Sequence, residues 1–154
     1  MSYQLTENFV FMAHSSSDQH AQILIEIAST LHRYVKLKKL GIVRVAPFTV
    51  FLDQTNIFQP DICFISNQDI HLIQSEGFFG IPKLIIEITS PLDDSFDVNE
   101  KKEIYESAGV EEYWIINSID KSTIGHKLEN GKYLSKYKGK NKLELNNPKL
   151  KIKF

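Results

Sequence analysis

The sequence predicts a mixed α/β (α+β) fold, in which helices pack on a β-sheet, and three patterns carry this prediction. Apolar residues recur at helical spacing after residue 18, residues 83–89 form an almost continuously apolar run, and a second helical pattern follows that run. A chain of 154 residues is long enough to bury a core of its own. We therefore expect residues 1–154 to form a single domain.

The first predicted helix spans residues 18–40. Residues 15–18 offer side-chain oxygens that can cap a helix N-terminus, and Gly41 offers a stop. Between them, apolar residues recur every three or four positions, which places them on one helical face. This face consists of Ile23, Leu24, Ile27, Leu31 and Val35.

Three strands are predicted after this helix. Residues 42–45 and 48–53 are rich in β-forming residues and meet at the bend made by Pro47. The polar pair Thr55–Asn56 follows as a turn, so we expect the second strand to be one arm of a hairpin. Residues 61–65 form a further short strand.

Residues 67–82 are interpreted as a loop stretch. It carries the aromatic pair Phe78–Phe79, which we expect to be exposed. An exposed aromatic pair marks an interface with another subunit or a lid folded over a site, and the sequence leaves both open.

The second half of the chain continues with strands and one helix. The apolar run at 83–89 is typical of a strand covered on both faces. The second helix is predicted at 97–108, with Asp97 and Glu100 as a variant of the capping box. A strand is predicted at 112–117, and hairpin strands from residue 122 onward around the turn signal Asn130–Gly131.

Composition and charge limit the classes of function. The formal net charge of -1 gives no support to a protein that coats DNA nonspecifically. The single cysteine, Cys63, excludes an internal disulfide and fits a reducing compartment, and the chain lacks an apolar run that could cross a membrane. The expected location is the cytoplasm.

The charge is distributed unevenly along the chain. Residues 125–154 contain nine lysines and two glutamates, a net charge of +7, so the other residues carry -8. With Tyr133 and Tyr137 interleaved, this basic C-terminal segment, about residues 122–154, could follow a phosphate backbone. An equally good interpretation is a lysine-rich edge hairpin that prevents aggregation between sheets.

The signatures of several other chemistries are absent. The sequence has no P-loop, no G-x-G-x-x-G, no G-x-S-x-G and no H-E-x-x-H motif. One cysteine cannot form a zinc finger. The five histidines show no ligand-like spacing, so each is expected to be a surface or capping residue.

Two acidic residues lie where a strand should be apolar. Glu87 interrupts the run Leu-Ile-Ile-Glu-Ile, and a buried carboxylate is costly unless it is paired or bound to a metal. Asp61 opens the strand after Pro60. The alternatives are a turn-capping aspartate and a strand-end glutamate that reaches solvent.

The second predicted helix adds a lysine to these carboxylates. Lys101 shares the spacing i, i+3, i+4, i+7 with Ile104, Tyr105 and Ala108, so it lies on the face directed at the sheet. Lys102 lies about 100° away and is expected to pair with Glu106. A lysine on the buried face can also reach water or bond Asp97. Two carboxylates and an inward lysine together favour a hard divalent cation with a lysine beside it.

Four blocks of sequence in this order resemble the Uma-two family, a bacterial group within the restriction-endonuclease-like PD-(D/E)XK superfamily. The resemblance covers roughly residues 18 to 137. The blocks are Gln59-Pro60-Asp61-Ile-Cys-Phe-Ile, Pro82-Lys-Leu-Ile-Ile-Glu87-Ile-Thr-Ser90-Pro91, Asp97-Val-Asn-Glu-Lys101-Lys-Glu-Ile-Tyr105 and Gly109-Val-Glu-Glu-Tyr113-Trp114-Ile-Ile-Asn.

The resemblance implies a restriction-endonuclease-like mixed sheet flanked by helices, with Mg²⁺ or Mn²⁺ held by Asp61, Glu87 and the backbone carbonyl of Ile88. The superfamily's usual lysine falls two residues after the glutamate, at Thr89 in this chain. In the Uma-two pattern a lysine of the following helix takes its place, and Lys101 matches that position. His20 and Asp97 are candidates for supporting these residues.

The expected function is that of a metal-dependent endonuclease that hydrolyses DNA phosphodiester bonds, with Asp61, Glu87 and Lys101 as the catalytic residues. DNA is the expected partner, no membrane contact is expected, and a homodimer is left open. The alternative is a catalytically inactive nucleic-acid-binding or interaction module on the same fold, an alternative supported by Thr89 in place of the usual lysine.

Overall fold

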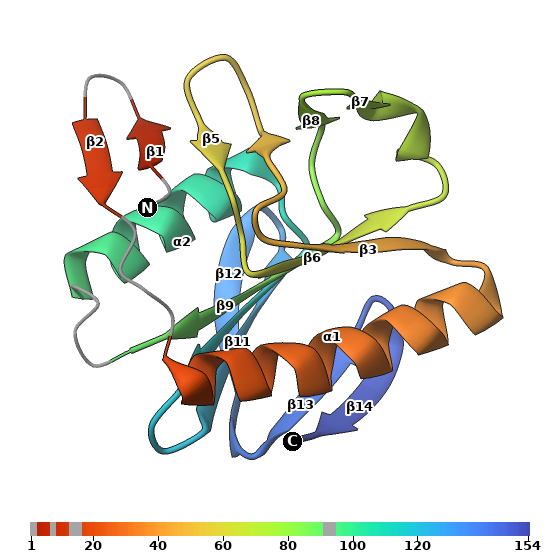
Figure 1. Ribbon diagram of the computed structural model, residues 1–154, viewed down its shortest axis with the longest axis vertical. Helices are drawn as coiled ribbons and strands as arrows, with labels where there is room; N and C mark the ends of the chain where they lie inside the picture. The colour runs from red at the N-terminus through yellow and green to blue at the C-terminus, as the bar shows by residue number, and fades with distance from the viewer. Residues whose placement is uncertain (1–2, 7–8, 13–16, 91–94) are drawn as a thin grey trace.

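The computed structural model describes residues 3–6, 9–12, 17–90 and 95–154, and a six-stranded mixed sheet forms the centre of this part of the chain (Figure 1). The strand order is β12-β11-β10-β9-β6-β3, and only β9 and β10 run parallel. The strands are β3 (Gly41–Val45), β6 (Ile62–Ser66), β9 (Leu84–Thr89), β10 (Glu112–Asn117), β11 (Ser122–Glu129) and β12 (Lys132–Lys140). The strands predicted at 42–45, 61–65, 83–89 and 112–117 are thereby confirmed.

Helix α1 (Asp18–Lys38) confirms the first predicted helix. The Ser17 hydroxyl caps it by accepting a hydrogen bond from the His20 N–H at 3.1 Å. The helix ends at Lys39, which adopts the left-handed conformation with φ of 53°, rather than at Gly41. The predicted apolar face is buried except for the half-buried Leu24.

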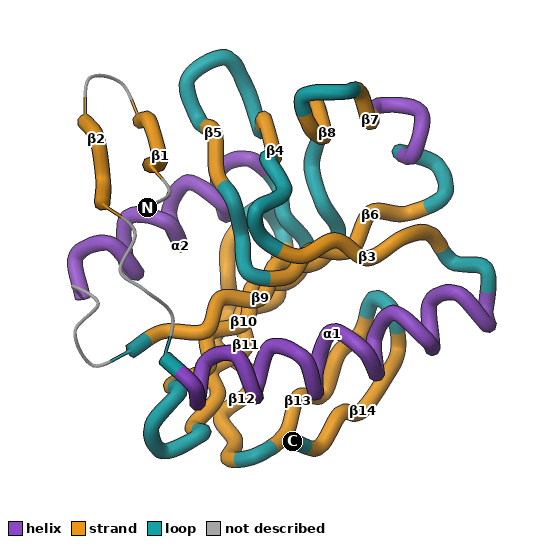
Figure 2. The backbone as a smooth tube through the Cα atoms, in the orientation of Figure 1, coloured by secondary structure: helices purple, strands orange, loops and turns teal. Residues whose placement is uncertain are grey.

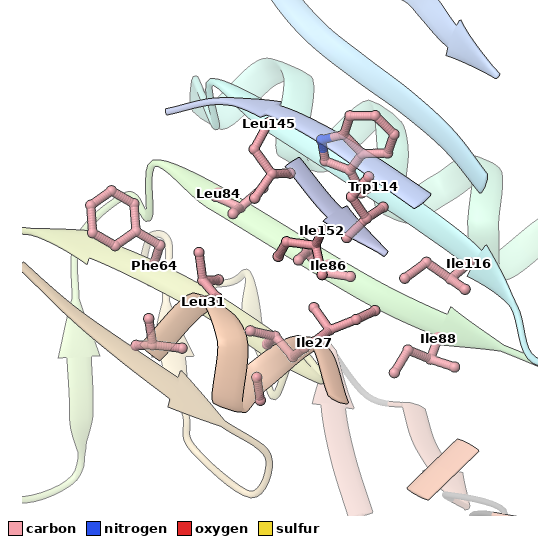
Figure 3. Packing of buried hydrophobic residues seen from close by; sticks show 14 of the residues in the cluster. Ile27, Leu31, Phe64, Leu84, Ile86, Ile88, Trp114, Ile116, Leu145 and Ile152 are labelled. Carbon is pink, nitrogen blue, oxygen red and sulfur yellow. The ribbon is translucent and has the colours of Figure 1, made fainter. Parts of the chain in front are cut away.

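Both faces of the sheet are covered, as the apolar run at 83–89 predicted. The even-numbered residues of β9 pack with α1, and Figure 3 shows Ile27 and Leu31 beside Leu84, Ile86 and Ile88. Ile85 belongs instead to the second buried cluster, on the opposite face. Successive side chains of a strand alternate between faces, so β9 sits between two cores.

Helix α2 (Ser95–Ala108) covers this opposite face, and Figure 2 shows the two helices on either side of the sheet. Its Tyr105 is fully buried against Phe58 and Tyr113. The helix begins two residues before the predicted start at 97. The predicted capping box was therefore wrong: Asp97 lies in the first helical turn and pairs with Lys101.

A small four-stranded sheet occupies part of the region predicted as a loop. It contains β4 (Val50–Phe51), β5 (Ile57–Phe58), β7 (Ile73–Gln74) and β8 (Gly77–Phe79), with a 3₁₀ turn at Ile70–Leu72. The antiparallel β4–β5 pair confirms the predicted hairpin arm, although β4 is shorter than 48–53. Phe78 is fully buried, so the expected exposed pair was half wrong. Phe79 is 38% exposed and stacks on Phe51 with ring centres 4.2 Å apart.

Three further hairpins complete the described chain. β1 (Tyr3–Thr6) pairs with β2 (Phe9–Met12) near the N-terminus. β11 and β12 turn at Asn130–Gly131, where both residues have positive φ, as the turn signal predicted. β13 (Lys142–Asn146) and β14 (Lys149–Lys153) form a separate hairpin whose apolar face packs under α1. Neither described helix has the length and hydropathy needed to span a bilayer.

Candidate metal centre

Strand pairing places the two predicted carboxylates opposite each other. β6 and β9 are antiparallel, with Ile62 opposite Ile86, so Asp61, the residue before β6, falls opposite Glu87. Asp61 shares strand parity with Cys63, and Glu87 with Ile85, and both of these neighbours belong to the cluster on the α2 face. The two acidic side chains therefore lie on one face of the sheet, at the end where β6 begins.

Asp61 is held from two directions. Its Oδ2 accepts a hydrogen bond from the Ile88 N–H at 2.7 Å, and its Oδ1 lies 3.1 Å from His20 Nε2. The Asp61 and His20 side chains are only 18% and 17% exposed. The expectation that each histidine is a surface or capping residue is therefore wrong for His20, which reaches from the first turn of α1 to the edge of the sheet.

Glu87 is buried and held by a hydroxyl group. Its Oε1 accepts a hydrogen bond from the Tyr105 hydroxyl at 3.0 Å. Burial raises the pKa of Glu87 to about 7; the charge of Asp61 adds to the rise, and the ammonium of Lys101 opposes it. The site therefore places the charge of Asp61 close enough to disfavour ionisation of Glu87.

Lys101 is the cation of this site, as its helical position predicted. Its Nζ lies 3.7 Å from Glu87 Oε1 and 3.4 Å from Asp97 Oδ2, and the side chain is 17% exposed. The charge of Glu87 is the main cause that raises the pKa of Lys101, against the opposing effect of burial. The sequence left open that Lys101 reaches water or bonds Asp97. The contact with Asp97 is present, and Lys101 contacts Glu87 as well.

Lys102 acts on Glu106 only through its charge, which contributes least among the causes that lower the pKa of that carboxylate; the direct partners of Glu106 are others. The Glu106 carboxylate binds Lys132 Nζ at 3.1 Å and the backbone N–H of Tyr133, so its hydrogen-bonding partners lie on β12. Lys102 therefore lies outside the group of side chains around Glu87 and stands beside Lys101 as a natural comparison.

The donor set of this site consists of oxygen atoms. Within the described ranges, no group of three or more His, Cys, Asp or Glu side chains is arranged to hold a metal ion. The backbone carbonyl of Ile88 can supply the third donor. The Thr89 carbonyl accepts a hydrogen bond from the Ser118 N–H on the β10 side of β9, and the backbone groups of successive strand residues point to opposite sides. The Ile88 carbonyl therefore points toward Asp61, as its N–H does. Two carboxylates and a carbonyl fit Mg²⁺ or Mn²⁺, which fill their other positions with water or phosphate oxygen. A cation would also relieve the repulsion between the carboxylates.

Four buried polar residues were not predicted from the sequence. Tyr105 was assigned only to an apolar stripe, although its spacing of four residues from Lys101 indicated the same face. His126 is buried against Tyr113 and Tyr133, contrary to the expected surface position, and burial lowers its pKa. Glu112 and Lys127 are also buried, and no pattern in the sequence distinguished this pair from exposed charges.

The fold is of the mixed α+β class, and it brings two carboxylates and a lysine together at one end of the sheet. The Uma2 family model, whose description reads "Putative restriction endonuclease", matches residues 2–148. The chain therefore belongs to the Uma2 family, the family that the four sequence blocks resemble.

One solved structure and the curated proteins complete the comparison. A crystal structure at 1.96 Å of a "putative nuclease belonging to DUF820" from Anabaena variabilis ATCC 29413 aligns with a TM-score of 0.70 and 17% identity. The alignment covers 88% of this chain and 77% of that one. At this identity the likeness shows a common fold, and it confirms the predicted fold class. No curated protein matches the chain.

Proposed function

We propose that this protein is an endonuclease that depends on a divalent metal ion and hydrolyses DNA phosphodiester bonds. The observation that carries the proposal is the juxtaposition of Asp61 and Glu87 across β6 and β9, with Lys101 Nζ 3.7 Å from Glu87. Membership of the Uma2 family supports the reaction class, and the all-oxygen donor set supports the metal.

Asp61, Glu87 and the carbonyl of Ile88 would hold Mg²⁺ or Mn²⁺. A bound ion supplies polarisation of the scissile phosphate and a lower pKa for a coordinated water. Contacts within the protein orient both carboxylates before any ion binds. The backbone N–H of Ile88 and the His20 ring fix the orientation of Asp61, and the Tyr105 hydroxyl fixes that of Glu87. Such supporting contacts keep the ligand oxygens in place during the reaction.

Lys101 takes the role of the lysine that the superfamily carries at the position of Thr89. The Thr89 hydroxyl donates to the Ile116 carbonyl at 3.3 Å, so this side chain is directed toward β10. The Lys101 ammonium, held between Glu87 and Asp97, is placed to stabilise negative charge that develops on the phosphate or to orient the attacking water. Asp97 and His20 act as positioning residues.

The expected partner is DNA, and the expected location is the cytoplasm. Cys63 is compatible with a reducing compartment and takes no part in the chemistry, because burial raises the pKa of its thiol to about 12. A thiol in this environment acts as a small apolar group of the core.

Nicking of supercoiled plasmid DNA tests the proposal. We expect the wild-type chain to nick the plasmid in Mg²⁺ or Mn²⁺ and to be inactive in EDTA. Asp61→Asn and Glu87→Gln should each reduce the rate by at least about a hundredfold, since each removes a charged ligand. Glu111→Gln, a change of the same kind at a half-exposed carboxylate, should leave the rate within about twofold.

Unchanged nicking by either ligand variant would refute the assignment. DNA binding without nicking in either metal would favour the alternative, a nucleic-acid-binding module that has lost turnover.

A further inference from the structure

We infer that the outward face of the β13–β14 hairpin, whose start and end lie at the metal-centre end of the sheet, binds the phosphate backbone of DNA. We call this face the lysine face; it consists of Lys142, Lys149, Lys151 and Lys153. The choice of DNA as the partner rests on the proposed function, whereas the position and charge of the face are independent of it.

The hairpin separates apolar from charged side chains. Leu143, Leu145 and Ile152 are buried under α1, and the four lysines alternate with the apolar residues and are exposed. Because alternate residues of a strand are about 7 Å apart, Lys149, Lys151 and Lys153 form a straight row of cations along β14. A row of this kind suits a DNA strand, which carries one phosphate per 3.4 Å of helix axis.

The charge on this face is not balanced within the hairpin. Lys142 lies directly opposite Lys153 in the antiparallel register, an arrangement of like charges that destabilises a hairpin by itself. Glu144 is the only acidic residue of β13 and β14, and it is shared by Lys142 at 3.3 Å and Lys151 at 3.7 Å. Lys149 lies opposite the neutral Asn146. The face therefore retains a cationic excess that polyanions would neutralise.

Backbone hydrogen bonds connect this face to the end of the sheet that carries the carboxylates. Ser118 N–H donates to the carbonyl of Thr89, two residues after Glu87, at 2.9 Å. The turn that follows β10 reaches Lys121, whose carbonyl accepts from Asn141 at 2.9 Å, and the Asn141 carbonyl accepts from Phe154 at 3.1 Å. The start of β13 and the end of β14 thus lie at the metal-centre end of the molecule (Figure 1).

The hairpin is also fixed to the central sheet. Glu112 Oε1 accepts hydrogen bonds from the N–H groups of Asn146 and Asn147 at 2.7 and 2.6 Å, and Lys127 Nζ donates to the Glu144 carbonyl at 3.2 Å. The lysines are therefore presented on a rigid platform, which lowers the entropic cost of binding an extended polyanion.

Fluorescence anisotropy with a labelled DNA duplex, in EDTA so that no cleavage occurs, tests the inference. The lysine-face variant is Lys149→Gln/Lys151→Gln/Lys153→Gln in the full chain. Its matched control is Lys36→Gln/Lys38→Gln/Lys39→Gln, which removes three exposed charges around the far end of α1. We expect the lysine-face variant to bind at least about tenfold more weakly at low salt. The slope of log K against log[KCl] should fall in magnitude by roughly 2 to 3, with the control unchanged.

Three results would overturn the inference: no duplex binding by the wild type, equal losses in both variants, or an unchanged salt slope in the lysine-face variant. Aggregation of the lysine-face variant with unchanged DNA affinity would assign the lysines to protection of the sheet edge. Labelled polyglutamate serves as a second probe; binding to it but not to DNA would assign the face to an acidic protein.

Failure of the proposed function gives a different pattern. A protein that never nicks plasmid but loses duplex affinity only in the lysine-face variant would keep this inference and refute the nuclease. A protein that nicks plasmid only when Asp61 and Glu87 are intact, yet binds duplex through residues outside the lysine face, would support the nuclease and refute this inference.

Discussion

Burial makes the ionised form of Glu87 costly in the folded protein, and the same burial places the carboxylate where it can bind a ligand. Its carboxyl group is buried, lies opposite Asp61, and is also near Lys101, Asp97, Tyr105 and Tyr113. Burial raises the pKa values of both tyrosines, so they stay neutral, and Lys101 is the cation that offsets the two acids. A folded protein without metal therefore bears a cost when Glu87 ionises.

This cost predicts a pH-dependent effect of Glu87→Gln. The pKa of Glu87 rises from 4.5 to about 7 on folding. Its contribution to stability is thus complete below the unfolded value and is lost as the pH rises through the folded value. In EDTA, the variant and the wild type should have similar unfolding free energies near about pH 5. Near about pH 8 the variant should be more stable by about 1 kcal/mol or more.

Urea denaturation at the two pH values measures this difference. Asp53→Asn, at an exposed turn away from the site, provides the control. A wild type that is more stable than Glu87→Gln at the higher pH would show that the ionised carboxylate is stabilised in the absence of metal, contrary to this account.

At the scale of secondary-structure elements, local patterns predicted the helices and the long strands, because apolar spacing and turn residues can be recognised within short segments of sequence. They also predicted the inward direction of Lys101. The register that places Asp61 opposite Glu87 was not accessible from local patterns, because β6 and β9 are separated by 17 residues of chain. The resemblance to the Uma-two family, and not the strand patterns, brought these two residues together. The short strands β7 and β8 were missed because two- and three-residue strands leave no periodic signal.

A buried carboxylate is one of several side chains that attach the β13–β14 hairpin to the rest of the protein. Glu112 accepts from Asn146, Asn147 and the Trp114 indole, and lies 3.9 Å from Lys127. Glu112→Ala leaves the Lys127 ammonium and the Trp114 indole buried without their carboxylate partner and should destabilise the protein by about 3 kcal/mol. Amide exchange should also accelerate across β13–β14.

The neighbouring substitution Glu111→Ala is the control. Glu111 is 43% exposed, pairs with Lys83 and accepts a hydrogen bond from Asn147 Nδ2 at 2.8 Å, so its loss should cost at most about 1 kcal/mol. Equal stability of the two variants would mean that burial of Glu112 gives its contacts no more weight than those of the half-exposed Glu111.

At the scale of the whole molecule, the net charge of -1 combines an acidic body that carries the site with a basic C-terminal segment. The sequence predicted this division, but not that the segment splits between two hairpins, since β11–β12 belongs to the central sheet and β13–β14 does not. Near-neutrality is therefore compatible with contact between DNA and one side of the molecule.

Both hairpins contribute to buried clusters, so the account predicts that residues 1–154 unfold as one domain. Trp114, the single tryptophan, is 1% exposed in the core beneath α1. Its fluorescence and the far-ultraviolet circular dichroism should give the same midpoint in urea. A separate early transition seen only by circular dichroism would instead divide the chain into two units.

The central claim is that Lys101, from α2, completes a catalytic group with Asp61 and Glu87. Single-turnover plasmid nicking in Mn²⁺ by Lys101→Ala and Lys102→Ala tests it most directly, because the two variants remove the same charge from adjacent positions of one helix. We expect a loss of about a hundredfold or more for Lys101→Ala, and a rate within about twofold of the wild type for Lys102→Ala. Equal rates for the two variants, whether both high or both low, would contradict it.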